Sequence, residues 1–200
     1  IRVIDPNGVT VVDDRVLVIE VMGLHAVFIA LHAGLAGTAD VILIPEIPYE
    51  LSKVCEKIVA RGKAGRHFSI VVVAEGAAPK GGEVSTMGPS LPGQDRRVGG
   101  GASRLAYEIQ GMTGKETRSL VLGHLQRGGT PPGYDRLLAT RFGSAAVRAV
   151  EQQRWGHMVA LQSPHIVTIP ISEALRQTKR VDPDHDVVQT ARQIGISFGD

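Results

Sequence analysis

Apolar runs of strand length alternate along the chain with segments of helical period. The runs that predict strands are 16–21, 41–44, 68–74 and 119–122, and the segments that predict helices are 26–36, 51–60, 103–109 and 134–152. Within 51–60, for example, the apolar positions recur at the spacing that places them on one face of a helix. Strands that alternate with helices indicate a mainly parallel sheet with helices on both faces, which is a three-layer α/β fold.

The remaining segments depart from this alternation. Two short strands, 158–161 and 166–169, are expected to form a hairpin around Ser163-Pro164, and helices are expected over 172–179 and 187–194. The region 76–101 is rich in Gly and Pro and predicts a long loop, a feature that is often functional in compact domains. Residues 2–12 predict a hairpin with Asn7-Gly8 at its turn.

Composition restricts the class of protein. The chain has 200 residues, of which 43% are hydrophobic and 21% charged, which excludes a disordered or fibrous protein. No apolar run approaches the length of about 20 residues that spans a bilayer, so we expect no transmembrane helix and no membrane partner. Cys55 is the only cysteine, which favours a reducing compartment and a cytoplasmic location. No signal-peptide pattern opens the sequence. Its first residue is Ile1, not Met, which suggests a fragment or a processed product.

The charge balance gives one further indication. The net charge is only +2, so charge alone does not indicate a nucleic-acid partner. The basic residues are 16 Arg and 6 Lys. The planar guanidinium binds phosphate or carboxylate through two hydrogen bonds, so the bias is compatible with an anionic ligand. The coding bias of a GC-rich genome explains it at least as well.

The densest group of chemically capable residues lies in 116–136. His124 and Arg127 follow the strand 119–122, and glycines on either side allow a close backbone approach, whereas Arg118 precedes the strand. In open parallel sheets ligands bind beyond the carboxyl ends of the strands. For each residue alone a structural turn is the favoured interpretation, but the combination indicates an anionic ligand.

Other strand ends carry weaker candidates. Glu75 follows the strand 68–74 and could accept hydrogen bonds from sugar hydroxyls, and Met22-Gly23 follows the strand 16–21. Taken singly, these are compatible with a loop charge and with a core methionine beside a turn glycine. The segment 99–103 precedes a helix and could donate backbone N–H groups to a phosphate. Neither standard glycine-rich nucleotide fingerprint occurs, and His25 and His32 share a helix face without a third metal ligand.

Several of these segments together resemble the second half of 6-phosphofructokinases of the bacterial type. They are 15–23, 25–26, 31–37, 44–46 and above all 122–143, which reads LGHLQRGGTPPGYDRLLATRFG. The resemblance extends from about Arg15 to Gly199 and implies a phosphofructokinase-like fold. It divides the chain into an atypical N-terminal segment, 1–14, and a sugar-phosphate-binding region, 15–200. The nucleotide-binding half of the family has no counterpart in this sequence.

The resemblance also implies roles for individual residues. Met22 and Gly23 would contact fructose 6-phosphate, Glu75 would accept its hydroxyls, and His124 and Arg127 would hold the sugar and its 6-phosphate. Two further arginines would reach a neighbouring subunit's substrate, which implies a homo-oligomer, in this family a homotetramer. These are Arg15 and Arg118.

The activity implied is glycolytic phosphoryl transfer from ATP or pyrophosphate to the 1-hydroxyl of fructose 6-phosphate. The donor, Mg²⁺ and the family's general base belong to the half that is absent, so we expect no catalytic residue here and no activity from this chain alone. Leu24 stands where the family usually has Arg, and Val27 and Phe28 stand where Gly and Trp are common. Leu24 favours the alternative of a non-catalytic sugar-phosphate-binding or regulatory homologue. Asp40 and 63–66 match effector positions of the family in part, and a solvated loop is the favoured interpretation of both.

Overall fold

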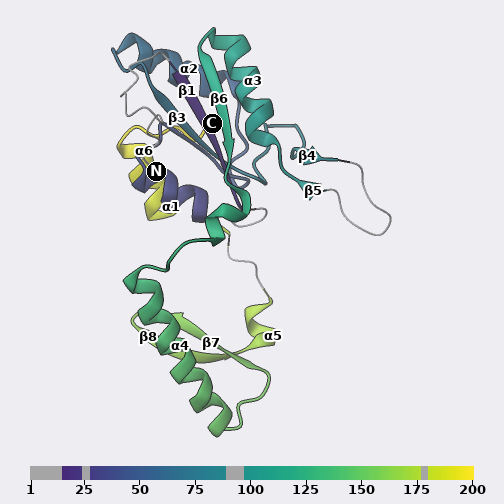
Figure 1. Ribbon diagram of the computed structural model, residues 1–200, viewed down its shortest axis with the longest axis vertical. Coiled ribbons are helices and arrows are strands. Elements are labelled where there is room, and N and C mark those ends of the chain that lie inside the picture. The colour runs from purple at the N-terminus through teal and green to yellow at the C-terminus, as the bar shows by residue number, and fades with distance from the viewer. Residues whose placement is uncertain (1–14, 24–27, 89–96, 177–179) are drawn as a thin grey trace. The chain divides into compact units, whose positions relative to one another are not determined.

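The computed structural model describes residues 15–23, 28–88, 97–176 and 180–200. They belong to two compact units. The first runs to Gln126 and resumes at Arg180, and the second spans Arg127–Lys179. Figure 1 shows the elements of both units. The predicted hairpin at 2–12 lies outside the described residues.

A four-stranded parallel sheet forms the centre of the first unit. Its strands are β1 (Arg15–Val21), β2 (Val41–Leu43), β3 (Ser69–Ala74) and β6 (Glu116–Val121), in the order β2-β3-β1-β6. Val21 pairs with Ala74, and Glu20 pairs with Val121. Since the three longest strands are parallel and end in register, the residues that follow them emerge at one edge of the sheet. The sequence-based prediction of a parallel sheet is confirmed.

Helices cover both faces of this sheet. On one side α3 (Gly101–Thr113) contacts β1 and β6 and packs against α2 (Leu51–Lys63), whereas α1 (Phe28–Ala36) contacts β2 and β3 and packs against α6 (Asp186–Gln193). The side chain of Glu20 meets the start of α3. Its neighbours Ile19 and Val21 line a small apolar cavity with Ala33 of α1. Adjacent residues of a strand point to opposite faces, so α1 and α3 lie on opposite sides of the sheet, as a three-layer fold requires.

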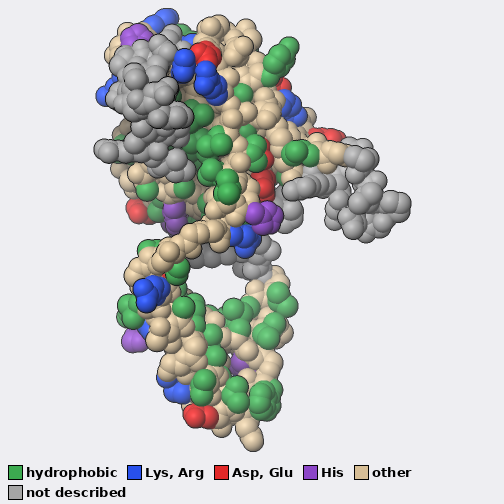
Figure 2. Space-filling model, in the orientation of Figure 1, with side chains coloured by type: hydrophobic (Ala, Val, Ile, Leu, Met, Phe, Trp, Pro, Cys, Tyr) green, Lys and Arg blue, Asp and Glu red, His purple; other side chains and the backbone are tan. Residues whose placement is uncertain are grey.

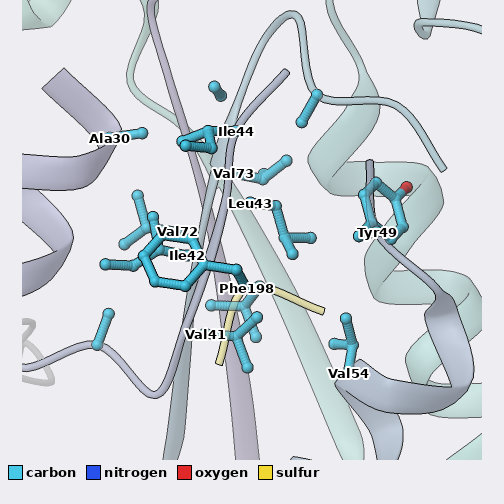
Figure 3. Close-up of a cluster of buried hydrophobic side chains, with 14 of the residues drawn as sticks. Ala30, Val41, Ile42, Leu43, Ile44, Tyr49, Val54, Val72, Val73 and Phe198 are labelled. Carbon is cyan, nitrogen blue, oxygen red and sulfur yellow. The ribbon is translucent and has the colours of Figure 1, made fainter. Parts of the chain in front are cut away.

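The last residues of the chain return to the edge of β2. The Ile42 amide donates to the Ser197 carbonyl at 2.9 Å, and the Ser197 amide donates to the Asp40 carbonyl at 3.0 Å. This pairing brings Phe198 into the core, where it is fully buried. Figure 3 shows its ring among the buried side chains of β2 and β3. The C-terminal segment, although distant in the sequence, therefore covers the β2 edge of the sheet.

The region between β3 and α3 contains more regular structure than its composition suggests. Instead of an irregular loop throughout, it forms an antiparallel ribbon of β4 (Thr86–Met87) and β5 (Arg97–Val98). Gly and Pro favour loops, and a ribbon with only two paired residues in each strand is too short to leave a hydrophobic period in the sequence. The prediction of a long loop is corrected for these residues, and 89–96 lie outside the described part.

The second unit is a helix on a hairpin. It contains α4 (Gly133–Glu151), the antiparallel strands β7 (His157–Gln162) and β8 (His165–Pro170), and the short α5 (Ile171–Ala174). The predicted hairpin is confirmed. The helix predicted over 172–179 is wrong as far as the chain is described, because it ends at Ala174. Leu175 is exposed, so no apolar face stabilises a longer helix.

None of the described residues of the second unit is buried. Hydrophobic side chains are spread over its surface instead (Figure 2), among them Tyr134, Leu137, Val147, Val150 and Trp155. One helix against two strands covers only one side of each element. Isolated hairpins are marginal at best in water, so this unit lacks a core of its own.

Candidate functional site

Three loops meet at the carboxyl edge of the sheet. Met22 and Gly23 follow β1, Glu75 follows β3, and the one-turn helix η1 (Gly123–Arg127) follows β6. Because β1 lies between β3 and β6, its end is next to both of the other loops. This is the edge at which open parallel sheets bind their ligands.

Side-chain acceptors fix the turn after β1. The Met22 amide donates to Gln126 Oε1 at 2.7 Å, and the Gly23 amide donates to Glu75 Oε2 at 3.4 Å. The Gly23 carbonyl in turn accepts from the Gly76 amide at 2.9 Å. The sequence-predicted residues Gly23 and Glu75 are therefore in direct contact, and the adjacent Met22 is joined to η1 through Gln126.

His124 and Arg127 both lie in η1, and both are exposed. His124 is two residues before Gln126, which places its backbone beside the turn after β1. Arg127 ends η1 and is the first residue of the second unit. The exposure of both side chains is compatible with ligand binding, and their roles stay predictions.

Arg15 and Arg118 form a separate cluster around Glu116. Arg15 Nε lies 3.0 Å from Glu116 Oε2, and Arg118 Nη2 lies 2.7 Å from Oε1. The hydrogen bond from Arg118, with Arg15 adding to it, holds the pKa of the Glu116 carboxyl below its ordinary value. Arg15 begins β1 and Glu116 begins β6, so the cluster lies at the amino edge. Six residues of strand, about 20 Å, separate Arg15 from the end of β1. The structure thus does not bring these arginines to the chain's own Met22-Gly23 turn.

The turn before α3 already holds an anion that belongs to the protein. Glu20 is almost fully buried, and its carboxylate accepts from the Gly100 amide at 3.3 Å and from the Ala102 amide at 2.8 Å. The sequence-based expectation that 99–103 offers amides to a phosphate is therefore wrong. The positive end of the helix is neutralised internally, since a carboxylate is favoured at a helix N-terminus.

Neither a metal centre nor a membrane span is found in the described part of the chain. Its side chains include no group of three or more His, Cys, Asp or Glu that could hold a metal ion. None of its helices combines the length and the apolar character needed to cross a membrane.

Comparison with known proteins identifies the family. A family model of phosphofructokinase matches residues 8–150. The chain is 52% identical over 187 residues to the ATP-dependent 6-phosphofructokinase of Chloroflexus aurantiacus. The chain belongs to the phosphofructokinase family. It is also 48% identical over 186 residues to the pyrophosphate–fructose 6-phosphate 1-phosphotransferase of Streptomyces coelicolor.

The chain spans about half the length of the curated relatives it matches. The aligned part covers 94% of the chain and 51% of the Chloroflexus protein, and 92% of the chain and 53% of the Streptomyces protein. A solved phosphofructokinase from Pichia pastoris in the T-state superimposes with a TM-score of 0.66 at 32% identity, covering 81% of this chain and 17% of that one. A pyrophosphate-dependent phosphofructokinase from Nitrosospira multiformis gives a TM-score of 0.72 at 23% identity, covering 95% and 50%. The last match shows the fold alone.

Two residues that hold the turns at this edge of the sheet escaped the sequence analysis. Glu20 is a single charge inside the apolar run of β1, and a buried charge requires partners, so its position in the run was a usable signal. Gln126 lies between His124 and Arg127, but nothing in its spacing distinguishes a structural glutamine from a solvent-exposed one. Only the pairing of β6 with β1 shows that it reaches Met22.

Asp40 is not part of a solvated loop. Arg61 Nη1 lies 2.7 Å from Asp40 Oδ1, and the Ile70 amide donates to Oδ2 at 2.9 Å. Burial raises the pKa of the Asp40 carboxyl above its ordinary value, although the Ile70 amide and Arg61 act in the opposite direction. These contacts tie α2 to β3 and give Asp40 a structural role.

Proposed function

We propose that this chain supplies the fructose 6-phosphate site of a 6-phosphofructokinase. The whole protein would transfer a phosphoryl group from ATP or pyrophosphate to the 1-hydroxyl of the sugar. The observation that carries the proposal is the contact of the Met22-Gly23 turn with Glu75, through the Gly23 amide, at the carboxyl edge of the sheet in a chain of this family. These residues come from segments 52 positions apart, so their contact is a property of the fold.

The chemistry of the edge suits a phosphorylated sugar. Glu75 uses Oε2 to hold the Gly23 amide, which directs Oε1 to accept from a sugar hydroxyl. His124 and Arg127 are exposed donors on η1, and a phosphate dianion is bound most strongly by charge-assisted hydrogen bonds. The sugar would contact the Met22-Gly23 turn, and Arg127 would be a ligand of its 6-phosphate.

Arg15 and Arg118 would serve the site of a neighbouring copy. Their cluster lies at the amino edge of the sheet, remote from Met22 and Gly23 of the same chain. The whole protein would therefore be a homo-oligomer, a homotetramer as in the family. Sedimentation that gives only monomer at high protein concentration would contradict this assignment.

The phosphoryl donor and its Mg²⁺ would be held by the half of the relatives that this chain does not match. The relatives named above include both an ATP-dependent and a pyrophosphate-dependent enzyme, so ATP and pyrophosphate are both proposed as donors. The setting proposed is glycolysis in the cytoplasm.

Calorimetry with fructose 6-phosphate tests the binding role. Arg127→Ala should remove a charge-assisted contact of roughly 1.5–3 kcal/mol, which weakens binding about 10- to 100-fold. Arg136→Ala is the matched control, because Arg136 is an exposed arginine of the same unit that no role is assigned to. Equal affinities of the wild type and Arg127→Ala would contradict the assignment.

Complementation tests the catalytic proposal. The chain alone should give no turnover with either donor, because a general base contributes about 10²–10⁴-fold and positioning of the donor contributes more. Adding the unmatched half of the Chloroflexus relative as a second polypeptide should create activity. Turnover by the chain alone, abolished by Arg127→Ala, would show that it contains its own base and donor site.

Leu24 is the residue that favours the alternative function, that of a non-catalytic or regulatory homologue. Leu24 lies outside the described residues, and it replaces the arginine that the resemblance places toward the transferred phosphate. In the complementation assay, activity that requires Leu24→Arg would favour the non-catalytic homologue. Activity with the native Leu24 would favour the enzyme.

A further inference from the structure

Glu20 is a buried charge that the proposed sugar contacts do not use. Only 2% of the residue is exposed, and it lies in β1 between two neighbouring strands. Its two carboxylate oxygens take separate partners, the Gly100 amide and the Ala102 amide. Burying an ionised carboxylate is costly unless it is fully hydrogen-bonded, so these two bonds define where the turn before α3 must lie.

The backbone of this turn wraps closely around the carboxylate. Gly99 and Gly100 have φ angles of +147° and +79°, which other residues rarely adopt. A Cβ atom at Gly99 would lie 3.6 Å from Glu20 Oε1, and one at Gly101 would lie 3.7 Å from Oε2. The Gly99 amide also donates to the Ser85 carbonyl at 3.0 Å, so the turn anchors the base of the β4–β5 ribbon.

The segment between β3 and α3, residues 75–100, forms an excursion from the sheet. Both ends of this excursion are attached to the end of β1. At its beginning the Glu75 amide donates to the Val21 carbonyl at 3.1 Å, and the Gly76 amide donates to the Gly23 carbonyl at 2.9 Å. At its other end, the amides of the turn before α3 donate to Glu20. The excursion that starts with Glu75 is thus attached to residues 20–23 at both ends, through the carboxylate of Glu75 at its beginning and the carboxylate of Glu20 at its other end.

We propose that Glu20 is a positioning residue for the sugar-phosphate site, an inference that rests on the proposed function. Its charge, favoured by the N-terminus of α3, holds the far end of the excursion. By fixing the excursion to β1, Glu20 limits the conformations open to Glu75 and to the Gly23 turn. Ligand binding then costs less conformational entropy.

The test compares three variants of the full chain with the wild type. Glu20→Ala removes both acceptors. Glu20→Gln keeps the shape of the side chain and one acceptor, and it provides a folded variant if Glu20→Ala does not fold. Val18→Ala is the control, because Val18 is fully buried two residues earlier on the same face of β1. Amide exchange at Gly100 and Ala102 is measured by NMR, and fructose 6-phosphate affinity by calorimetry.

Glu20→Ala should accelerate exchange of the Ala102 amide at least tenfold and weaken fructose 6-phosphate binding about tenfold, and Glu20→Gln should have smaller effects in the same direction. Sodium formate, but not sodium chloride, should restore part of both in Glu20→Ala. Val18→Ala should lower the melting temperature without either local effect. Unchanged exchange and affinity in both Glu20 variants, or equal losses of affinity in Val18→Ala, would overturn the proposal. If the wild type bound no fructose 6-phosphate, the proposed function would fail, and amide exchange alone would show whether Glu20 anchors the turn.

Discussion

Replacing Gly199 by alanine is expected to destabilise the first unit strongly, because two separate requirements for glycine coincide there. Gly199 has a φ angle of +78°, in the left-handed region. A Cβ atom at this position would lie 2.8 Å from Tyr49 Cβ, and 3.2 Å from both Leu43 Cδ2 and Val54 Cγ2. Its carbonyl also accepts from the Glu50 amide at 2.6 Å, so the backbone has little freedom to move away.

The expected loss of unfolding free energy follows from these two requirements. A left-handed conformation costs a non-glycine residue roughly 1–2 kcal/mol. An added methyl in a close-packed core costs about 1–3 kcal/mol, since Tyr49, Leu43 and Val54 must shift. The sum is about 2–5 kcal/mol, a large share of the 5–15 kcal/mol that typically separates folded from unfolded domains.

Gly195→Ala separates the two contributions. Gly195 has a similar φ angle of +88°, but the nearest atom to its added Cβ would be Lys57 Nζ at 3.8 Å, which is ordinary contact with a flexible side chain. Urea unfolding followed by circular dichroism should give the control only the backbone cost. Equal destabilisation of the two variants would refute the packing argument, and a neutral Gly199→Ala would refute both parts of it.

Three further predictions concern other parts of the chain. A peptide spanning 127–179 should show little helical circular dichroism and no cooperative melting, because none of its described residues is buried; a sharp melting transition would contradict this. Gln126→Leu should weaken fructose 6-phosphate binding in calorimetry, because it leaves the Met22 amide without its acceptor, whereas Gln126→Glu keeps an acceptor and should lose less; the reverse order would exclude this role. Arg192 hydrogen-bonds Asp200 and lowers the pKa of that carboxyl from 3.8. A lowered folded-state pKa adds stability above the ordinary pKa that is lost as the pH falls through the folded-state value. The stability advantage of the wild type over Asp200→Asn should thus shrink below pH 3.8, and an advantage independent of pH would refute the assignment.

The sequence predicted the strands of the sheet well because each is a short apolar run between polar or glycine-containing segments. β1, β3 and α2 fall within a few residues of their predicted bounds. The prediction failed where local preference had no tertiary partner to sustain it. The segment 172–179 has a helix-forming composition, yet α5 ends at Ala174 and Leu175 is exposed.

The candidate site, like the fold, could be predicted from the sequence only in part. Met22, Gly23 and Glu75 could be placed at one edge from the sequence, because residues that follow parallel strands emerge together. Their mutual hydrogen bonds could not, since the order β2-β3-β1-β6 and the register decide which loops are neighbours. The resemblance assigned Arg15 and Arg118 to a neighbouring subunit's substrate, and only the register shows that both meet Glu116 at the amino edge.

By itself, the sequence determined the alternation of strands and helices, the parallel sheet and the family, because each depends on the order of residue types along the chain. Tertiary structure alone decided that the carboxylate of Glu20 fills the turn before α3 and that Gln126 holds Met22. The reason is physical. These contacts join residues 82 and 104 positions apart, and a buried polar group selects its partner by distance in space, about which local sequence carries no information.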